Sequence, residues 1–195
     1  MLKISKGLGN LAPETLRFYR QIGVEEVQIP ARLNTRINLR PLVPPTQSQA
    51  FGPMPPVWDE DELRRICDHV RRFDLEPTAI ALPLSGRILM GEEGRDEDLD
   101  DVAERVEMAG RVELGVLTWN FTALQASEGY AAQEKAGRGG ADLRDFDYAR
   151  IRDLPPLKEL GTHGMDEMWG RLEYCLRRIV PVAEAAGVKL AMHPN

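Results

Sequence analysis

The sequence predicts an α/β protein built on a mainly parallel sheet. Short apolar segments alternate with amphipathic helical patterns along the whole chain. The helical patterns begin with proline or acidic residues, and several end at glycine, which are ordinary helix start and stop signals. Strands and helices that alternate in this way pair in parallel through right-handed crossovers. The order therefore indicates either a doubly wound open sheet or a (β/α)8 barrel, and both bind ligands at the carboxyl ends of their strands.

The first predicted elements are short. "LKISKGLG" begins as a strand and turns into a loop at its glycines. "LAPETLRFYRQIGV" is typical of a helix, because Pro13 suits a first turn and Gly23 suits the stop. Its apolar residues recur at helical spacing and are Leu16, Tyr19 and Ile22. "EEVQIPA" follows as the second strand.

Two helix–strand units and a final pair complete the pattern. "DEDELRRICDHVRRFDL" has acids in its first turn, where the helix dipole favours them. Its apolar stripe consists of Leu63, Ile66, Cys67 and Val70. "PTAIALPL" is apolar almost throughout, as expected of a buried parallel strand. "RDEDLDDVAERVEMAGR" and "VELGVLTWNF" repeat the unit, and "DEMWGRLEYCLRRIVPVAEAAG", which Pro181 should bend, leads to the strand "VKLAMH".

Long connections separate some of these elements. Residues 31–57 are rich in proline, which breaks helices and removes a strand donor, and residues 122–165 show no clear periodicity. Each connection follows a strand, so both lie at the carboxyl end of the sheet, where loops of this length are usually functional. We therefore expect residues 1–195 to form a single domain with two long loops on the active-site side.

Composition argues against several classes of function. The formal net charge is −6, and basic residues are interleaved with acids, so nucleic-acid binding is not expected. No apolar run approaches the roughly 20 residues that cross a bilayer, and "MLKISKGLGN" lacks a signal-peptide core, so no membrane role is expected. Cys67 and Cys175 lie far apart in helical patterns, which favours a reduced, cytoplasmic protein. Assembly into a homo-oligomer stays open.

Three histidines are candidates for chemistry, and their positions differ. His69 lies within a charged helix and is best explained as a surface residue, whereas His163 precedes a helix and could cap it or face a site. His193 ends the fifth predicted strand, where α/β enzymes place their functional groups. A neutral imidazole is the commonest protein metal ligand, but a strand-end histidine can equally well bind a neighbouring loop. Position alone leaves both interpretations of His193 open.

The end of the fourth predicted strand offers further candidates. Asn120 carries both a donor and an acceptor suited to a polyol or a carboxylate, and Trp119 could form a pocket wall. The alternatives are that Trp119 packs in the core and that Asn120 begins a turn. Farther on, Arg138 lies among glycines in "EKAGRGGADLRDFD", which suits a flexible loop whose cation pairs with a carboxylate. No phosphate-binding fingerprint or Ser-His-Asp arrangement is present in the sequence.

Several of these segments resemble mannonate dehydratases. "MWGRLEYCLRRIVPVAEAAGVKLAMHPN" is similar to a family segment in which a helix ending I-V-P-V-A-E-E-A-G-V leads to a strand ending A-x-H-P-D-D-P-P. "LRFYRQIGVEEVQIP" resembles the family's first helix and second strand, "GVLTWNF" its strand ending Y-N-F, and "GRGGAD" a glycine-arginine segment in the next loop. The order and spacing of these segments extend the resemblance over nearly the whole chain.

The resemblance implies a fold and an activity. The fold would be a xylose-isomerase-like (β/α)8 TIM barrel, here incomplete with about five βα units. The activity would be dehydration of the sugar acid D-mannonate to 2-keto-3-deoxy-D-gluconate in hexuronate breakdown. The family uses Mn²⁺ or Fe²⁺, held by histidines, a cysteine and an aspartate.

The resemblance also implies roles for individual residues. His193 matches the histidine of H-P-D and would be a metal ligand, and Asn195 stands where that motif has its acid. Asn120 matches the asparagine of Y-N-F and would contact substrate, with Trp119 beside it and Arg138 facing substrate from the loop. The catalytic acid and base remain unassigned.

A complete barrel needs eight strands, and the sequence predicts five. The remaining ligands are then expected in a second half, which makes this chain the N-terminal portion of a longer protein. Two alternatives remain at this point. One is a sugar isomerase or epimerase of the same fold, since fold does not fix reaction. The other is a catalytically inactive chain that acts at most as a binding or assembly module.

Overall fold

The computed structural model describes residues 3–30, 53–122, 130–155 and 161–193. Its main feature is a parallel sheet with the strand order β1-β2-β3-β4-β7. The strands are β1 (Ser5–Gly7), β2 (Glu26–Ile29), β3 (Glu76–Ala81), β4 (Val116–Trp119) and β7 (Lys189–Met192). Neighbours in the sheet follow chain order, and every pairing is parallel, which confirms the predicted class.

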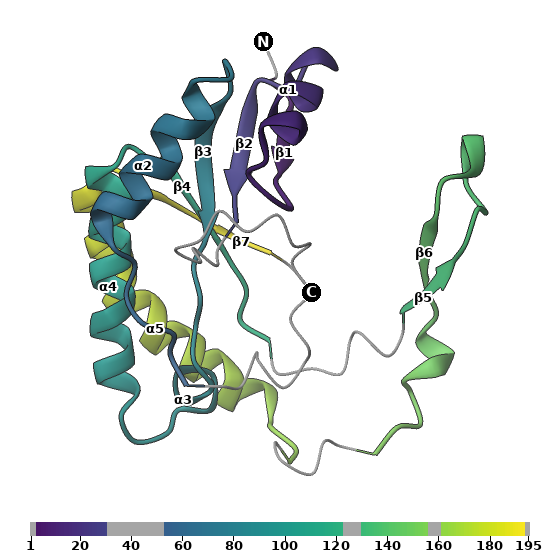
Figure 1. The fold of residues 1–195 in the computed structure, drawn as a ribbon. Helices are drawn as coiled ribbons and strands as arrows, with labels where there is room; N and C mark the ends of the chain where they lie inside the picture. Colours follow the sequence, from purple (N-terminus) through teal and green to yellow (C-terminus); the bar gives the residue numbers. More distant parts are fainter. Residues whose placement is uncertain (1–2, 31–52, 123–129, 156–160, 194–195) are drawn as a thin grey trace.

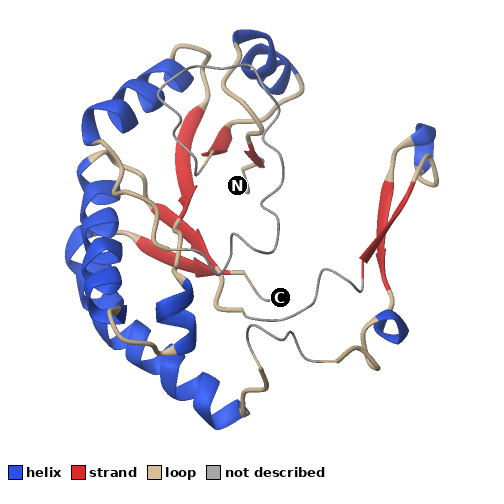
Figure 2. Ribbon diagram, turned by 60° about the horizontal axis from the view of Figure 1, so that its bottom comes forward, coloured by secondary structure: helices blue, strands red, loops and turns tan. Residues whose placement is uncertain are grey.

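Four longer helices and one short helix accompany the sheet. They are α1 (Pro13–Gln21), α2 (Glu60–Arg71), α3 (Gly86–Met90), α4 (Arg95–Arg111) and α5 (Met165–Ala186). Helices α2, α4 and α5 lie along one side of the sheet (Figure 1), and Figure 2 shows the sheet curving with these helices outside. A doubly wound sheet would carry helices on both faces. The described part is therefore an incomplete (β/α)8-type barrel that does not close, with β1 and β7 at its open edges.

The core lies between the helices and the outer face of the sheet. Alternate residues of the central strands face it, and Val27, Ile29, Ile80 and Leu117 are all nearly inaccessible to solvent. The stripe predicted for α2 is buried as expected and consists of Leu63, Ile66, Cys67 and Val70. Asp59 caps α2 by accepting a hydrogen bond from the Glu62 amide at 2.7 Å. These contacts fix the strands from outside and leave the opposite face free of described helices (Figure 2).

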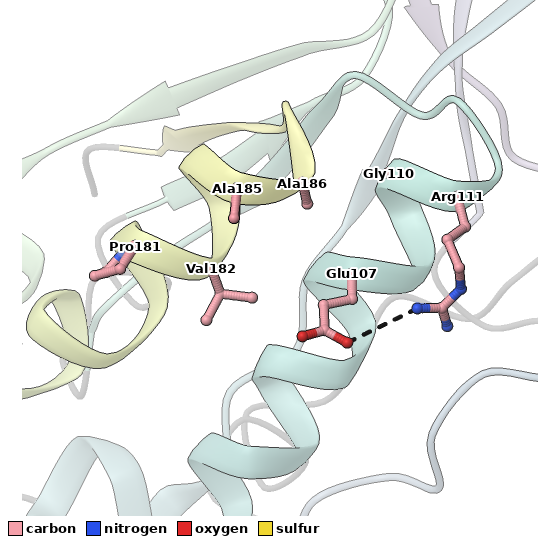
Figure 3. A pocket seen from close by; sticks show the side chains of 7 residues that line it. All are labelled: Glu107, Gly110, Arg111, Pro181, Val182, Ala185 and Ala186. Carbon is pink, nitrogen blue, oxygen red and sulfur yellow. Dashed lines mark ion pairs between the residues drawn. The ribbon is translucent and has the colours of Figure 1, made fainter.

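Helices α4 and α5 pack against each other more extensively than any other helix pair in the described chain. Between their carboxyl-terminal ends lies a surface groove of about 600 Å³ (Figure 3). The groove is lined by Glu107, Gly110, Arg111, Pro181, Val182, Ala185 and Ala186. Because these helix ends precede the amino ends of β4 and β7, the groove lies opposite the edge where ligands are expected.

Several local predictions were wrong. The segment 122–165 was expected to be irregular, but it contains an antiparallel hairpin of β5 (Tyr130–Gln133) and β6 (Leu143–Phe146). Gly139 and Gly140 adopt φ values of 68° and 80° in the connection, so glycine lets the chain turn back there. Ile22 was placed on the apolar side of α1, but it follows the helix and is 57% exposed. The sequence also gave no expectation of α3, which Ser85 caps.

The other predicted loop, 31–57, belongs to the described residues only from residue 53 onwards. Residues 31–52 lie outside the described residues, and residues 53–57 contain neither helix nor strand. Among the described helices, none is long and apolar enough to span a membrane.

Candidate functional site

The carboxyl ends of β4 and β7 lie side by side. Trp119 pairs with Met192 in the parallel register, and the next amide, that of His193, donates a hydrogen bond to the Trp119 carbonyl at 2.7 Å. Asn120 and His193 therefore leave the sheet at neighbouring positions, although 73 positions separate them in the sequence numbering. The structure brings together the two residues that were singled out at strand ends.

These two residues also share a face of the sheet. Side chains alternate along a strand, so Asn120 falls on the same side as Thr118, and His193 on the same side as Ala191. Thr118 and Ala191 are partners in the register, whereas Leu117 faces the helices and is fully buried. Asn120 and His193 are both exposed. They therefore lie on the inner side of the curve, where a (β/α)8 barrel holds its ligands.

Trp119 lies on the opposite side, in the core. It is 5% exposed and meets the Phe121 ring edge-on with 6.5 Å between centroids. Its indole Nε1 is buried and has no hydrogen-bond partner among the described residues. A buried indole donor ordinarily has a partner. The core interpretation of Trp119 is thus supported, while a contact with substrate stays a prediction.

Arg138 and Asn195 are not seen near this edge. Arg138 begins the 3-10 turn η3 (Arg138–Gly140) at the end of the hairpin and is exposed. The hairpin stands away from the sheet in both views (Figures 1 and 2). The structure therefore does not bring Arg138 to Asn120 and His193. Asn195 lies outside the described residues.

A side-chain contact near this edge was missed by sequence reasoning. The Gln28 amide Nε2 donates to Thr118 Oγ1 at 2.9 Å, and this bond joins β2 to β4. The strand between them, β3, offers only the methyl group of Ala81 beside Thr118. The signal in the sequence was a polar residue at the third position of each strand, Gln28 in "EVQI" and Thr118 in "VLTW".

The other two histidines take part in structural contacts. His69 Nε2 lies 2.9 Å from the Leu11 carbonyl oxygen, and its ring meets Phe73 edge-on, so it holds α2 against the segment before α1. His163 Nδ1 lies 3.5 Å from Glu167 Oε2 and 3.3 Å from an Arg171 guanidinium nitrogen, at the start of α5. The surface interpretation of His69 needs correction, because the ring is partly buried and bonded.

The described residues do not make a metal site by themselves. No group of three or more His, Cys, Asp or Glu side chains converges in the described part of the chain. His193 offers one imidazole at the expected edge, and its described neighbour Asn120 offers an amide oxygen. The thiols are no substitute, because desolvation raises the pKa of Cys67 to about 11 and that of Cys175 to about 12. Both remain protonated at neutral pH, and only the thiolate binds metal.

Comparison with known proteins adds to this geometry. A family model for D-mannonate dehydratase (UxuA) matches residues 161–195, which include α5, β7 and His193. The mannonate dehydratase of Streptococcus uberis (strain ATCC BAA-854 / 0140J) is 23% identical over 165 residues, which is 73% of this chain and 47% of that protein. That of Streptococcus equi subsp. zooepidemicus (strain MGCS10565) is 25% identical over 166 residues, or 73% of this chain and 46% of that protein.

The fold agrees with these matches. The crystal structure of mannonate dehydratase from Streptococcus suis serotype 2 superposes with a TM-score of 0.73 at 22% identity. The chain is therefore similar to mannonate dehydratases in sequence and in fold. The superposition covers 100% of this chain and 54% of the other, and this chain spans about half the length of the curated mannonate dehydratases it matches. The expected relationship and barrel type are thereby confirmed.

Proposed function

We propose that this chain belongs to a metal-dependent enzyme that dehydrates D-mannonate to 2-keto-3-deoxy-D-gluconate in hexuronate catabolism. The observation that carries the proposal is that Asn120 and His193 follow the neighbouring carboxyl ends of β4 and β7, which the His193–Trp119 backbone hydrogen bond joins. His193 lies in the segment that the D-mannonate dehydratase model matches. The fold alone would permit other reactions, so the proposal depends on this edge and on the sequence matches. We infer a cytoplasmic enzyme with a sugar-acid substrate, and its assembly into homo-oligomers is an additional proposal.

The residues would act on the substrate in different ways. His193 would provide one neutral imidazole ligand for Mn²⁺ or Fe²⁺, with its remaining ligands outside the described residues. When bound, such an ion supplies positive charge that stabilises negative charge developing next to the substrate carboxylate. Asn120 can donate to and accept from substrate hydroxyls, and Trp119 would support that strand end from behind. Arg138 would have to approach from the hairpin to pair with the carboxylate, and Asn195 would orient the ligand beside it.

The test is turnover of D-mannonate by the protein as the cell produces it, supplied with Mn²⁺ or Fe²⁺ after treatment with a chelator. We expect formation of the 2-keto-3-deoxy acid that stops on chelation and returns with metal. Conversion of a ketose to its epimer or isomer without dehydration would contradict the proposal and support the rival enzyme class.

The role of His193 has its own measurement. His193→Ala should lower the metal bound per chain, measured by equilibrium dialysis, to well below one ion. It should also abolish turnover, because one metal ligand is lost. His163→Ala is the matched control, since that histidine lies just before α5 and contacts Glu167 and Arg171. Metal retained at full stoichiometry in the His193 variant would remove this residue from the site.

A further inference from the structure

The Gln28–Thr118 bridge is unusual in its span. Strands β2 and β4 are two strand spacings apart, about 9.5 Å in a flat sheet. The long Gln28 side chain closes that gap on the inner face, because β3 presents only methyl groups there, from Ala79 and Ala81. Ala79 pairs with Gln28, and Ala81 pairs with Thr118. The bridge therefore forms a polar layer on the inner face of the curved sheet.

This layer lies directly beneath the candidate site. Asn120 follows Thr118 by two residues on the same face, and Ala191, the register partner of Thr118, is followed in the same way by His193. Gln28, Thr118, Asn120 and His193 thus occupy one face at the carboxyl end of β2, β4 and β7. All four carry groups that bind oxygen-rich ligands.

After this hydrogen bond is formed, both Gln28 and Thr118 keep further donor and acceptor groups. A threonine hydroxyl has one proton and two acceptor positions, and Thr118 uses an acceptor position for the Gln28 amide. Its proton must then be directed elsewhere. Gln28 likewise retains its carbonyl oxygen and a second amide proton. Among the described residues, no further hydrogen bond of either side chain accompanies this one, so the remaining donors and acceptors are available on the inner face.

We propose that Gln28 and Thr118 form the floor of the substrate site and that the Thr118 hydroxyl donates to an oxygen of a bound polyhydroxy acid. Gln28 is a positioning residue: its amide occupies one lone pair of Thr118 Oγ1 and so sets the direction of the hydroxyl proton. The inference rests on the proposed function, because it assigns two residues to that same substrate.

The test compares variants of the protein as the cell produces it in steady-state kinetics with D-mannonate. Thr118→Val keeps the β-branched shape and removes the hydroxyl, so KM should rise about 3- to 10-fold with little change in kcat. Thr118→Ser should restore most of the affinity. Gln28→Met should raise KM less, and it should have no further effect when Thr118 is already valine, because the two residues act through one hydroxyl.

A threonine elsewhere in the sheet provides the control. Thr78→Val removes a hydroxyl from the middle of β3, at a position without a register partner in β2, and should leave KM unchanged. Calorimetric Kd values for D-mannonate with the same variants separate this inference from the proposed function. A wild type that binds but does not dehydrate would contradict only the function, provided that Thr118→Val still weakens binding. Unchanged KM and Kd in Thr118→Val, or an equal effect of Thr78→Val, would overturn the inference.

Discussion

Asp98 is a buried carboxylate that holds the segment following β3. It is 2% exposed, and its Oδ2 accepts from Ser85 Oγ at 2.5 Å and from Arg87 Nε at 2.9 Å, while Oδ1 accepts from Arg87 Nη2 at 2.5 Å. Ser85 also caps α3 through the Ile88 amide at 3.2 Å. The cluster therefore ties the carboxyl end of β3 to the first turn of α4. A helix rich in acids gave no sign that one of them would be buried.

This cluster predicts a clear difference between two aspartates of α4. Asp98→Ala should lower the free energy of unfolding by about 2–3 kcal/mol, because the Ser85 hydroxyl and the Arg87 guanidinium lose their shared acceptor. Asp100→Ala removes only an exposed ion pair with Arg178 and should cost less than about 1 kcal/mol. Urea unfolding of both variants measures the difference. Equal losses would show that the Asp98 cluster contributes no more than a surface pair.

The two cysteines predict a dependence on pH. Burial raises the pKa of the Cys67 and Cys175 thiols from 9.0 to about 11 and about 12. The folded protein therefore holds these protons more tightly than the unfolded chain, so stability is fully present below about pH 9 and falls as pH rises towards 11. At pH 8 neither thiol should react with a thiol reagent until urea unfolds the chain. Rapid labelling under native conditions would contradict the buried placement.

At the scale of elements, the helices could be predicted well and the hairpin could not. α2 and α4 carry apolar stripes and charged first turns within one continuous segment, so all of their signals are local. Strand β6 has three exposed positions and one partly buried position, which leaves no alternation of apolar and polar residues to detect. The short α3 depends on its cap residue Ser85 and on the hydrogen bond from Ser85 to the buried Asp98 of α4. That bond depends on the packing of α4, so local sequence does not reveal it.

The packing of α4 on α5 predicts opposite effects at two helical glycines. A Cβ at Gly110 would lie 2.6 Å from the Ala186 carbonyl oxygen, and backbone cannot yield cheaply. Gly110→Ala should therefore destabilise the protein by about 1–3 kcal/mol. Gly170 of α5 has open space around the same position, so Gly170→Ala should stabilise by about 1 kcal/mol through helix propensity. Chemical denaturation checks both, and a neutral Gly110 variant would mean that the helices separate easily.

At the scale of the whole molecule, the edge that carries the candidate site could be predicted from the sequence, but the Gln28–Thr118 contact beneath it could not. Strand ends in an α/β pattern point to one edge, and that rule selected Asn120 and His193 from local sequence. Gln28 and Thr118 are 90 positions apart, and their contact depends on the curvature of the sheet and on small residues in β3. Arg138 was expected in a flexible loop, but it lies in the connection of a hairpin, and its contact with substrate stays a prediction.

Both open edges of the sheet carry exposed apolar side chains. In or next to β1 and α1 these are Ile4, Phe18 and Ile22, and in α5 and β7 they are Met165, Trp169, Val180 and Met192. Met165, Trp169 and Val180 recur at helical spacing on one side of α5. Edge strands also present unpaired backbone groups, so each edge combines hydrogen-bonding and apolar surface.

This combination predicts association of the 195-residue chain with itself. The apparent molecular mass measured by light scattering should rise with protein concentration. The reason is that open strand edges can pair, and apolar helix sides can pack, between copies. Phe18→Glu together with Trp169→Glu should lower that mass, since charge is introduced at both edges. Tyr148→Glu is the matched control, because Tyr148 is 65% exposed but belongs to the hairpin segment. If the double variant associates as strongly as wild type while Tyr148→Glu does not, the hairpin and not the sheet edges mediates contact between copies.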